Sequence, residues 1–143
     1  MYEHYKSMVT SMSKPTKDDA DLLLKIMAIA TADKDYNEAT KWFFRDFGNM
    51  VYDDFKKKYP RGSEGYRHIM VYCSYGELLG VMVNKDLLSE DLVFDMWGSL
   101  NWERVESVVY GLRKDIGMPR FMENFEILAK KYKGWAEANP PKV

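Results

Sequence analysis

Cysteine, histidine and long apolar runs are scarce in this sequence. Cys73 is the only cysteine among 143 residues, which excludes an intrachain disulfide and a cysteine-based zinc site. The longest apolar stretch, residues 69–84, would extend only about 24 Å as a helix, and Glu77 interrupts it, so it is not a membrane span. The N-terminal segment MYEHYKSMVTSMSKP has neither the basic start nor the apolar centre of a secretory signal. We therefore expect a protein of the reducing cytoplasm.

An excess of one charge is also missing. The formal net charge is −1, which gives no general attraction to nucleic acid or anionic lipid. Two basic segments with tyrosines, KKKYPR (56–61) and KKYK (130–133), would suit single-stranded nucleic acid, but they equally fit helix C-termini. We therefore expect no nucleic-acid partner.

Signatures of cofactor chemistry are absent from the sequence. It has only two histidines and no Glu-x-x-His pair of the di-metal bundle type. It also has no glycine-rich phosphate loop or nucleophile elbow. We therefore expect no metal, no cofactor and no catalytic set, and we expect Cys73 to be a buried structural thiol.

What the sequence does contain is apolar and aromatic bulk in helical patterns. It is 46% hydrophobic and 15% aromatic, enough for one folded domain with a sizeable core. Apolar residues recur at helical spacing and no segment alternates as a strand would. We predict an all-α, antiparallel bundle of about six helices, with helices over about 17–31, 36–59, 64–84, 90–98, 102–116 and 119–138. Residues 1–15 are expected to be an arm or short helix, 16–138 a single helical domain, and 139–143 a tail.

Several residues mark the ends of these helices. Thr16 with Asp19 forms a plausible capping box, and Ser63, Ser89 and Asn101 are candidate N-caps. Gly117 fits just past a helix end and Pro119 fits a first turn. The stretch DLLLKIMAIA is apolar almost all round, which indicates a buried first helix, and Gly48 is expected to weaken or bend the second.

Glu77 is the one acid in the stretch YCSYGELLGVMV, residues 72–83. On a helix its neighbours are apolar or small, and Gly76 with Gly80 would let another helix approach closely. An isolated ionised carboxylate there would be costly, so it should find a cation or become protonated. Arg113 is the expected partner because its guanidinium can bind a carboxylate through two hydrogen bonds; Arg104 and Lys25 are alternatives.

Two interpretations of Glu77 follow from that position. The favoured one is a buried ion pair that fixes the register of the helices. The other is a general acid or base with a raised pKa at the edge of a pocket. No second catalytic group in the sequence supports the latter.

Large aromatic side chains exceed what one small core easily hides. Surfaces rich in tyrosine, tryptophan and methionine commonly mark protein contacts, including homodimer interfaces; partial burial at the core edge is the alternative. The candidate interaction aromatics are Trp97, Trp102, Tyr110 and Trp135.

The C-terminal two thirds of the chain also resembles a known family. YGELLGVMVNKDLLSEDLVFDMWG and NWERVESVVYGLRKDIGMPRFMENFEIL are similar to a family of small helical proteins classed only as a domain of unknown function. The resemblance covers about residues 20–132, and the matching positions are Tyr75, Glu77, Gly80, Leu88, Asp91, Leu92, Trp102, Arg113, Asn124, Phe125 and Glu126. It implies the helical fold and brings no reaction or substrate.

These observations favour a non-enzymatic helical module that binds protein and self-associates, for example as a homodimer. The alternative is a small-molecule-binding protein or enzyme with a pocket around Glu77.

Overall fold

The computed structural model describes residues 14–143, and within them every regular element is helical. In chain order the elements are α2 (Lys17–Ala32), α3 (Lys34–Trp42), the short π-helix η1 (Phe43–Phe47), α4 (Tyr52–Lys58), α5 (Glu64–Asn84), α6 (Glu90–Trp97), α7 (Trp102–Ile116) and α8 (Glu123–Ala138). The predicted all-α bundle is confirmed. The predicted arm falls mainly on residues 1–13, which lie outside the described residues.

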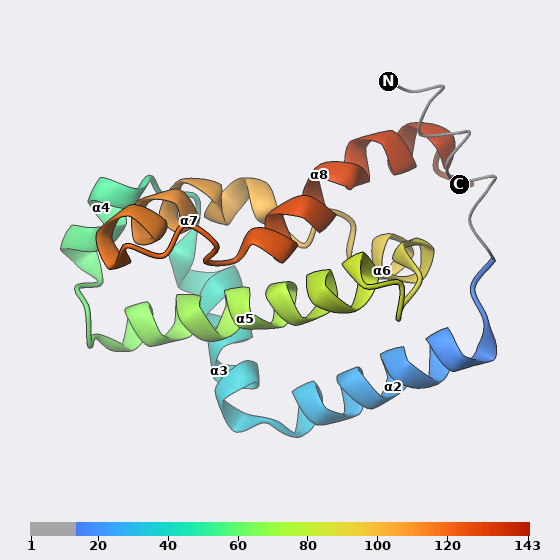
Figure 1. The fold of residues 1–143 in the computed structure, drawn as a ribbon. Coiled ribbons are helices and arrows are strands. Elements are labelled where there is room, and N and C mark those ends of the chain that lie inside the picture. The colour runs from blue at the N-terminus through green and yellow to red at the C-terminus, as the bar shows by residue number, and fades with distance from the viewer. Residues whose placement is uncertain (1–13) are drawn as a thin grey trace.

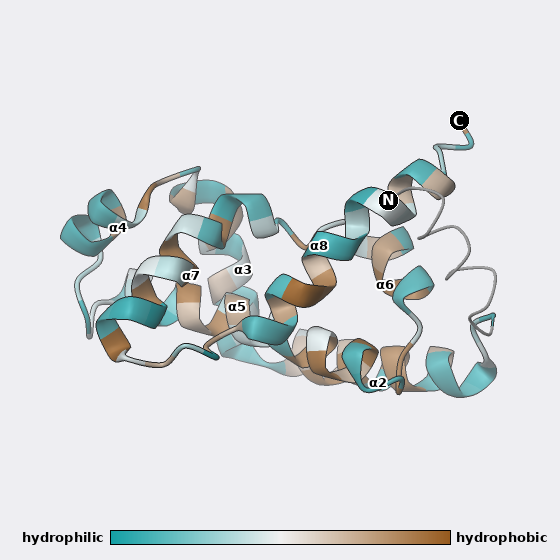
Figure 2. Cartoon of the chain, turned by 45° about the horizontal axis from the view of Figure 1, so that its top comes forward, coloured by the Kyte–Doolittle hydropathy of each residue, from teal (hydrophilic) through white to brown (hydrophobic). Residues whose placement is uncertain are grey.

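The longest helix, α5, occupies the middle of the molecule (Figure 1). Helix α2 lies along one side of α5 and runs in the opposite direction, and α7 and α8 on the other side are antiparallel to each other. The hydrophobic residues concentrate on α5 and on the neighbouring parts of α7 and α8, whereas α4 is largely hydrophilic (Figure 2). The core is rich in phenylalanine; its fully enclosed side chains include Phe43, Phe47, Phe55 and Phe125.

Local sequence signals explain most helix ends. The Thr16 hydroxyl accepts from the backbone of Asp19 while the Asp19 carboxylate accepts from the backbone of Thr16, so the predicted capping box is confirmed. The hydroxyls of Ser63 and Ser89 accept from backbone N–H groups in the first turns of α5 and α6. Gly117 follows α7 in the left-handed conformation, as its position predicts.

The prediction of one helix over 36–59 is wrong. The helix changes to π-type hydrogen bonding at Phe43 and ends at Gly48, where φ is +65°. That conformation suits glycine and stops a right-handed helix. The chain then passes through extended backbone at Val51 before α4 begins.

The first helix is not buried as expected. Only Leu23, Ile26 and Ala30 of α2 are enclosed, and Leu24 and Ile29 are each 67% exposed. The reason is the position of α2 at the edge of the molecule, where a single face meets the other helices (Figure 1).

Asn101 does not cap α7 either. It adopts the left-handed conformation and makes no side-chain cap, because its amide instead donates to the Tyr72 hydroxyl at 3.1 Å.

Candidate functional site

Glu77 caps the neighbouring helix α8. One carboxylate oxygen accepts from the Phe125 backbone N–H at 2.8 Å, and the other accepts from the Asn124 side-chain amide at 2.9 Å. The residue at the N-cap position of α8, Met122, offers no side-chain hydrogen bond. Glu77 therefore supplies from α5 the acceptor that the first turn of α8 needs, at the end where a helix favours negative charge.

Two glycines make this contact possible. A Cβ atom on Gly80 would lie 2.3 Å from the Asn124 backbone oxygen, and one on Gly76 would lie 2.6 Å from the Phe125 ring. Any larger residue would push α8 away from α5. The close helix approach expected from the Gly76–Gly80 spacing is confirmed.

A second amide extends the network around Glu77. The side chain of Asn84, at the end of α5, donates to the side-chain oxygen of Asn124 at 3.1 Å. That contact orients the Asn124 amide so that its nitrogen faces Glu77. The half-buried carboxylate is thus solvated by amide donors of α8 instead of by a cation.

The predicted ion pair between Glu77 and Arg113 does not form between these two described residues. Arg113 binds Glu126 at 2.8 Å, and its Nε donates to the Phe121 carbonyl at 2.6 Å. The guanidinium therefore ties α7 to the turn before α8 and to the first turn of α8. Arg113 is not available to Glu77 because it is already bound to Glu126, which lies on α8, the helix that Glu77 caps.

Glu126 collects three donors. Besides Arg113, it accepts from Lys130 Nζ at 2.6 Å and from the Tyr110 hydroxyl. Burial alone would raise the pKa of this carboxyl, but the hydrogen bonds from Lys130, Tyr110 and Arg113 outweigh it and lower the pKa to about 2. The cluster is a structural clamp between α7 and α8 in which one carboxylate binds two cations and a tyrosine hydroxyl.

Arg104 also lies apart from Glu77. It donates twice to the Gly48 carbonyl, at 2.7 and 2.9 Å, and once to the Phe43 carbonyl at 3.1 Å, and its guanidinium stacks over the Phe43 ring. The side chain therefore satisfies backbone carbonyls where the π-helix ends. Neither Arg104 nor Arg113 forms a shared site with Glu77.

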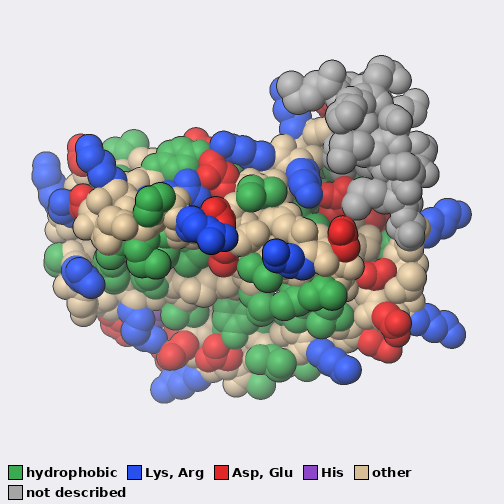
Figure 3. Space-filling view, viewed as in Figure 1, with side chains coloured by type: hydrophobic (Ala, Val, Ile, Leu, Met, Phe, Trp, Pro, Cys, Tyr) green, Lys and Arg blue, Asp and Glu red, His purple; other side chains and the backbone are tan. Residues whose placement is uncertain are grey.

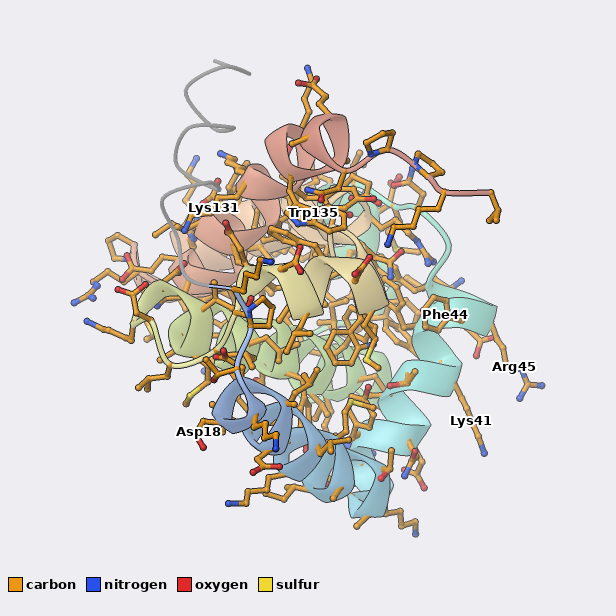
Figure 4. All side chains as sticks on the ribbon, turned by 90° about the vertical axis from the view of Figure 1, so that its right-hand side faces the viewer. Asp18, Lys41, Phe44, Arg45, Lys131 and Trp135 are labelled. Carbon is orange, nitrogen blue, oxygen red and sulfur yellow. The ribbon has the colours of Figure 1, made fainter. Side chains whose placement is uncertain are left out.

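The four candidate interaction aromatics divide into two pairs. Trp102 and Trp135 are 5% and 6% exposed, and their indole N–H groups donate to Glu106 and Asp91. Figure 4 shows Trp135 on α8. These two belong to the core, so they cannot form a contact surface. Tyr110 is partly exposed but is engaged with Glu126, and Trp97 is half-buried.

A group of half-buried apolar side chains does lie on α5. Apart from Glu77, the half-buried and exposed positions between Arg67 and Lys85 carry no charge. We call one stripe of them the α5 face; Ser74 is exposed, and the half-buried members are Met70, Val71, Leu78, Val81 and Met82. Hydrophobic side chains gather on this side of the molecule between α8 and α2 (Figure 3). Ile127, which is 47% exposed, stands on the edge of α8 that carries Asn124, one turn further along.

The α5 face was detectable in the sequence. Its members recur three and four residues apart in a stretch whose only charge is Glu77. The aromatic residues do not indicate it, because the face consists of aliphatic side chains, methionines and one serine.

Neither a cluster of metal-binding side chains nor a membrane-spanning helix occurs in the described part of the chain. Residues 14–143 hold no group of three or more His, Cys, Asp or Glu side chains placed to bind a metal ion. No helix in the same range is both long and apolar enough to cross a membrane.

The fold and these contacts define a compact helical domain in which Glu77, Arg104 and Arg113 each bind different partners. Residues 16–132 match the family described as Domain of unknown function (DUF4760), and the chain belongs to that family. No curated protein and no solved structure matches the chain.

Proposed function

We propose that this protein is a non-enzymatic interaction module that self-associates through the α5 face. The observation that carries the proposal is that α5 has a single charged residue, Glu77, between Arg67 and Lys85, and that α8 already binds it. A solvated helix face normally carries charged and polar residues. A continuous apolar stripe with charged residues at both ends is typical of a protein contact.

The proposed partner is a second copy, because the two ends of helix α5 offer opposite charges, Glu64 at its start and Lys85 just past its end. Glu64, at the start of α5, is 77% exposed, and Lys85, just past its end, is exposed and forms no ion pair with any described residue. An antiparallel two-fold pairing of α5 helices centred between Ser74 and Tyr75 would bring Glu64 opposite Lys85 of the second copy. Such a pairing is self-complementary, as a two-fold dimer requires.

Small and flexible side chains favour close packing at this contact. Ser74 lies near the centre of the face and its hydroxyl is already satisfied by the Met70 carbonyl at 2.6 Å. Met70 and Met82 can adjust their shape to a facing surface. The Glu77 contact to α8 holds α5 in place, so little ordering is needed on association.

The buried thiol bears on the cellular location of the protein. Cys73 is a free thiol buried in the core, so the fold needs no oxidising environment. We propose a reducing cytoplasmic location and a protein partner instead of nucleic acid. A fluorescent fusion observed in cells checks the location.

The test compares two matched substitutions by sedimentation equilibrium. Val81→Lys places a charge in the α5 face and should convert a dimer into a monomer, because burying an unpaired ammonium costs several kcal/mol. Val51→Lys is the control: Val51 is 57% exposed and precedes α4, so the same exchange there should leave the dimer intact. A wild-type protein that remains monomeric at millimolar concentration contradicts the proposal.

A charge exchange tests the pairing geometry. Lys85→Glu and Glu64→Lys should each weaken association by about tenfold, since each creates two like-charge contacts per dimer of roughly 0.5–1 kcal/mol. The double variant restores opposite charges and should recover most of the wild-type affinity. If the double variant is as weak as the singles together, the antiparallel arrangement is wrong.

A further inference from the structure

A cavity of about 320 Å³ lies at the end of the molecule where α4, the start of α5 and the end of α7 meet (Figure 1). Its lining residues come from α4, from the loop after α4 and from α7, and α5 contributes Tyr66. Lys56 and Asp115 also line it, and their side chains are 61% and 41% exposed, so the cavity reaches the surface beside them. None of the lining residues belongs to the α5 face, so a ligand here does not depend on self-association.

Three tyrosines line the cavity: Tyr52, Tyr59 and Tyr66. Two of their rings lie directly on glycines. A Cβ atom on Gly111 of α7 would lie 2.0 Å from the Tyr52 ring, and one on Gly65 of α5 would lie 2.1 Å from the Tyr59 ring. The two rings are therefore packed against helix backbone, and this aromatic surface is in place before a ligand arrives. Such preorganisation lowers the ordering cost of binding.

One cation of the cavity has no partner. The Lys56 ammonium donates to the Asp115 carboxylate at 2.8 Å, and the Tyr52 hydroxyl donates to the same oxygen at 2.6 Å. The charges of Lys56 and Asp115 therefore offset each other. Arg61 also lines the cavity; it is exposed and forms no hydrogen bond or ion pair with any described residue. A guanidinium binds a carboxylate through two parallel hydrogen bonds, so Arg61 is the group that an anionic ligand would meet.

The charge around the cavity has the same sign. The last turn of α4 carries three lysines, residues 56–58, and Arg61 follows in the loop. Asp53 and Asp54 in the first turn of α4 offset only part of this charge. Lysine and arginine side chains gather at the end of the molecule where α4 lies (Figure 3). A local excess of positive charge attracts anions although the whole chain is almost neutral.

From the tyrosines, the volume and the unpaired guanidinium we propose that the cavity binds a small aromatic carboxylate. An engineered apolar cavity of about 150 Å³ in another protein holds benzene, so 320 Å³ accommodates one ring with its carboxylate and a further substituent. The ring packs against the tyrosines, and the carboxylate pairs with the exposed Arg61 guanidinium. A neutral ring would not form that ion pair, and a cationic one would meet a like charge.

Three probes of nearly the same shape test the charge preference by ¹⁹F NMR titration of the full chain. 4-Fluorobenzoate is an anion, 4-fluorobenzamide is neutral and 4-fluorobenzamidine is a cation. The benzoate should bind saturably and about fivefold more tightly than the benzamide, and the benzamidine should bind most weakly. Added salt should reduce the difference, because it screens an exposed ion pair. If none of the three binds saturably, or if the benzamide or benzamidine binds as tightly as the benzoate, the proposal is wrong.

Competition distinguishes an aromatic site from a general anion site. Unlabelled benzoate should displace 4-fluorobenzoate, whereas acetate, which has the carboxylate without the ring, should compete at least about tenfold more weakly because it buries far less apolar surface. Acetate or inorganic phosphate that competes as well as benzoate would overturn the aromatic assignment.

A matched pair of substitutions locates the carboxylate. Arg61→Gln removes the guanidinium, so 4-fluorobenzoate should lose its fivefold advantage while 4-fluorobenzamide binds as before. Arg45→Gln is the control: Arg45 is exposed, does not line the cavity and points away from the molecule (Figure 4), so both affinities should stay unchanged.

A third variant locates the ring. Tyr66→Leu removes one aromatic side chain of the cavity and should weaken the benzoate and the benzamide alike, by about threefold. Thermal unfolding confirms that each variant is folded. Unchanged probe affinities in both Arg61→Gln and Tyr66→Leu would place the binding elsewhere and overturn the assignment.

Discussion

Removing the Glu77 carboxylate should release the first turn of α8. Glu77→Ala deletes the acceptor for the Phe125 backbone N–H and for the Asn124 amide. A hydrogen bond to a charged group contributes about 1.5–3 kcal/mol, and loss of an N-cap costs about 0.5–2 kcal/mol. The two ranges describe overlapping effects, so we expect the free energy of unfolding to fall by about 3 kcal/mol.

Glu77→Gln should cost less, about 1.5 kcal/mol, because one oxygen remains to accept from Phe125 N–H. The new amide nitrogen would face the Asn124 nitrogen, two donors in contact, unless the Asn124 amide turns over. Turning it over would break its contact with Asn84. The glutamine variant therefore loses the bond to Asn124 and the charge, but keeps the backbone cap.

Urea unfolding followed by far-ultraviolet circular dichroism measures these differences. Each variant should be made in the Val81→Lys background, so that dimerisation does not contribute to the measured stability. Glu64→Gln serves as the control on the same helix: its side chain is 77% exposed, and the exchange should change stability by less than about 0.5 kcal/mol.

A double-mutant cycle separates the two possible partners of Glu77. Asn124→Ala should couple to Glu77→Ala by about 1 kcal/mol, because the two side chains share a hydrogen bond. Arg113→Met should be additive with Glu77→Ala, because its guanidinium is bound to Glu126 and Phe121. Strong coupling to Arg113 with none to Asn124 would refute the capping argument.

Three further predictions address α8, the clamp and the thiol. Glu126 has its folded pKa lowered to about 2, so its stabilisation is present above the unfolded pKa near 4.5 and is lost as the pH falls toward 2; Glu126→Gln should flatten the stability profile measured by urea unfolding over that window, and an unchanged slope would contradict it. Gly80→Ala should destabilise by about 3 kcal/mol or more, since its Cβ would meet the Asn124 backbone at 2.3 Å; a melting temperature equal to wild type would show that α8 can move away freely. Burial raises the pKa of Cys73 to about 12, so a thiol reagent at pH 8 should label the native protein only at the rate of unfolding, and rapid native labelling would count against the enclosed thiol.

The helices and most of their ends were predictable because their signals are local. The Thr16 capping box, the Ser63 and Ser89 caps and Gly117 each act within one turn. The break after Phe47 was harder to predict, since Gly48 is tolerated inside many helices and only its positive φ shows that the helix ends.

The partner of Glu77 could not be obtained in the same way. It depends on how far α5 is shifted along α8, and helical spacing within one segment does not give that shift. Moreover, the main partner is the backbone N–H of Phe125, and every non-proline residue has such a group. The sequence prediction also began this helix too early: Pro119 lies in the preceding turn, and α8 begins at Glu123 with Met122 at its N-cap position.

The solitary acid on α5 and the bare face beside it have a common explanation. Between Arg67 and Lys85 the helix contacts the core on one side and α8 on another, and Glu77 is the only charged residue there because α8 provides donors for it. If Val71, Leu78 and Val81 faced only solvent, lysine or glutamate at these positions would cost almost no folding free energy. Half of the α5 face is explained by the core, because Met70, Leu78 and Met82 pack against it. The proposed self-association therefore rests on Val71, Ser74 and Val81. Should Val71→Lys and Val81→Lys leave both stability and oligomeric state unchanged, the face would have no occupant, and the capping role of Glu77 would stand without it.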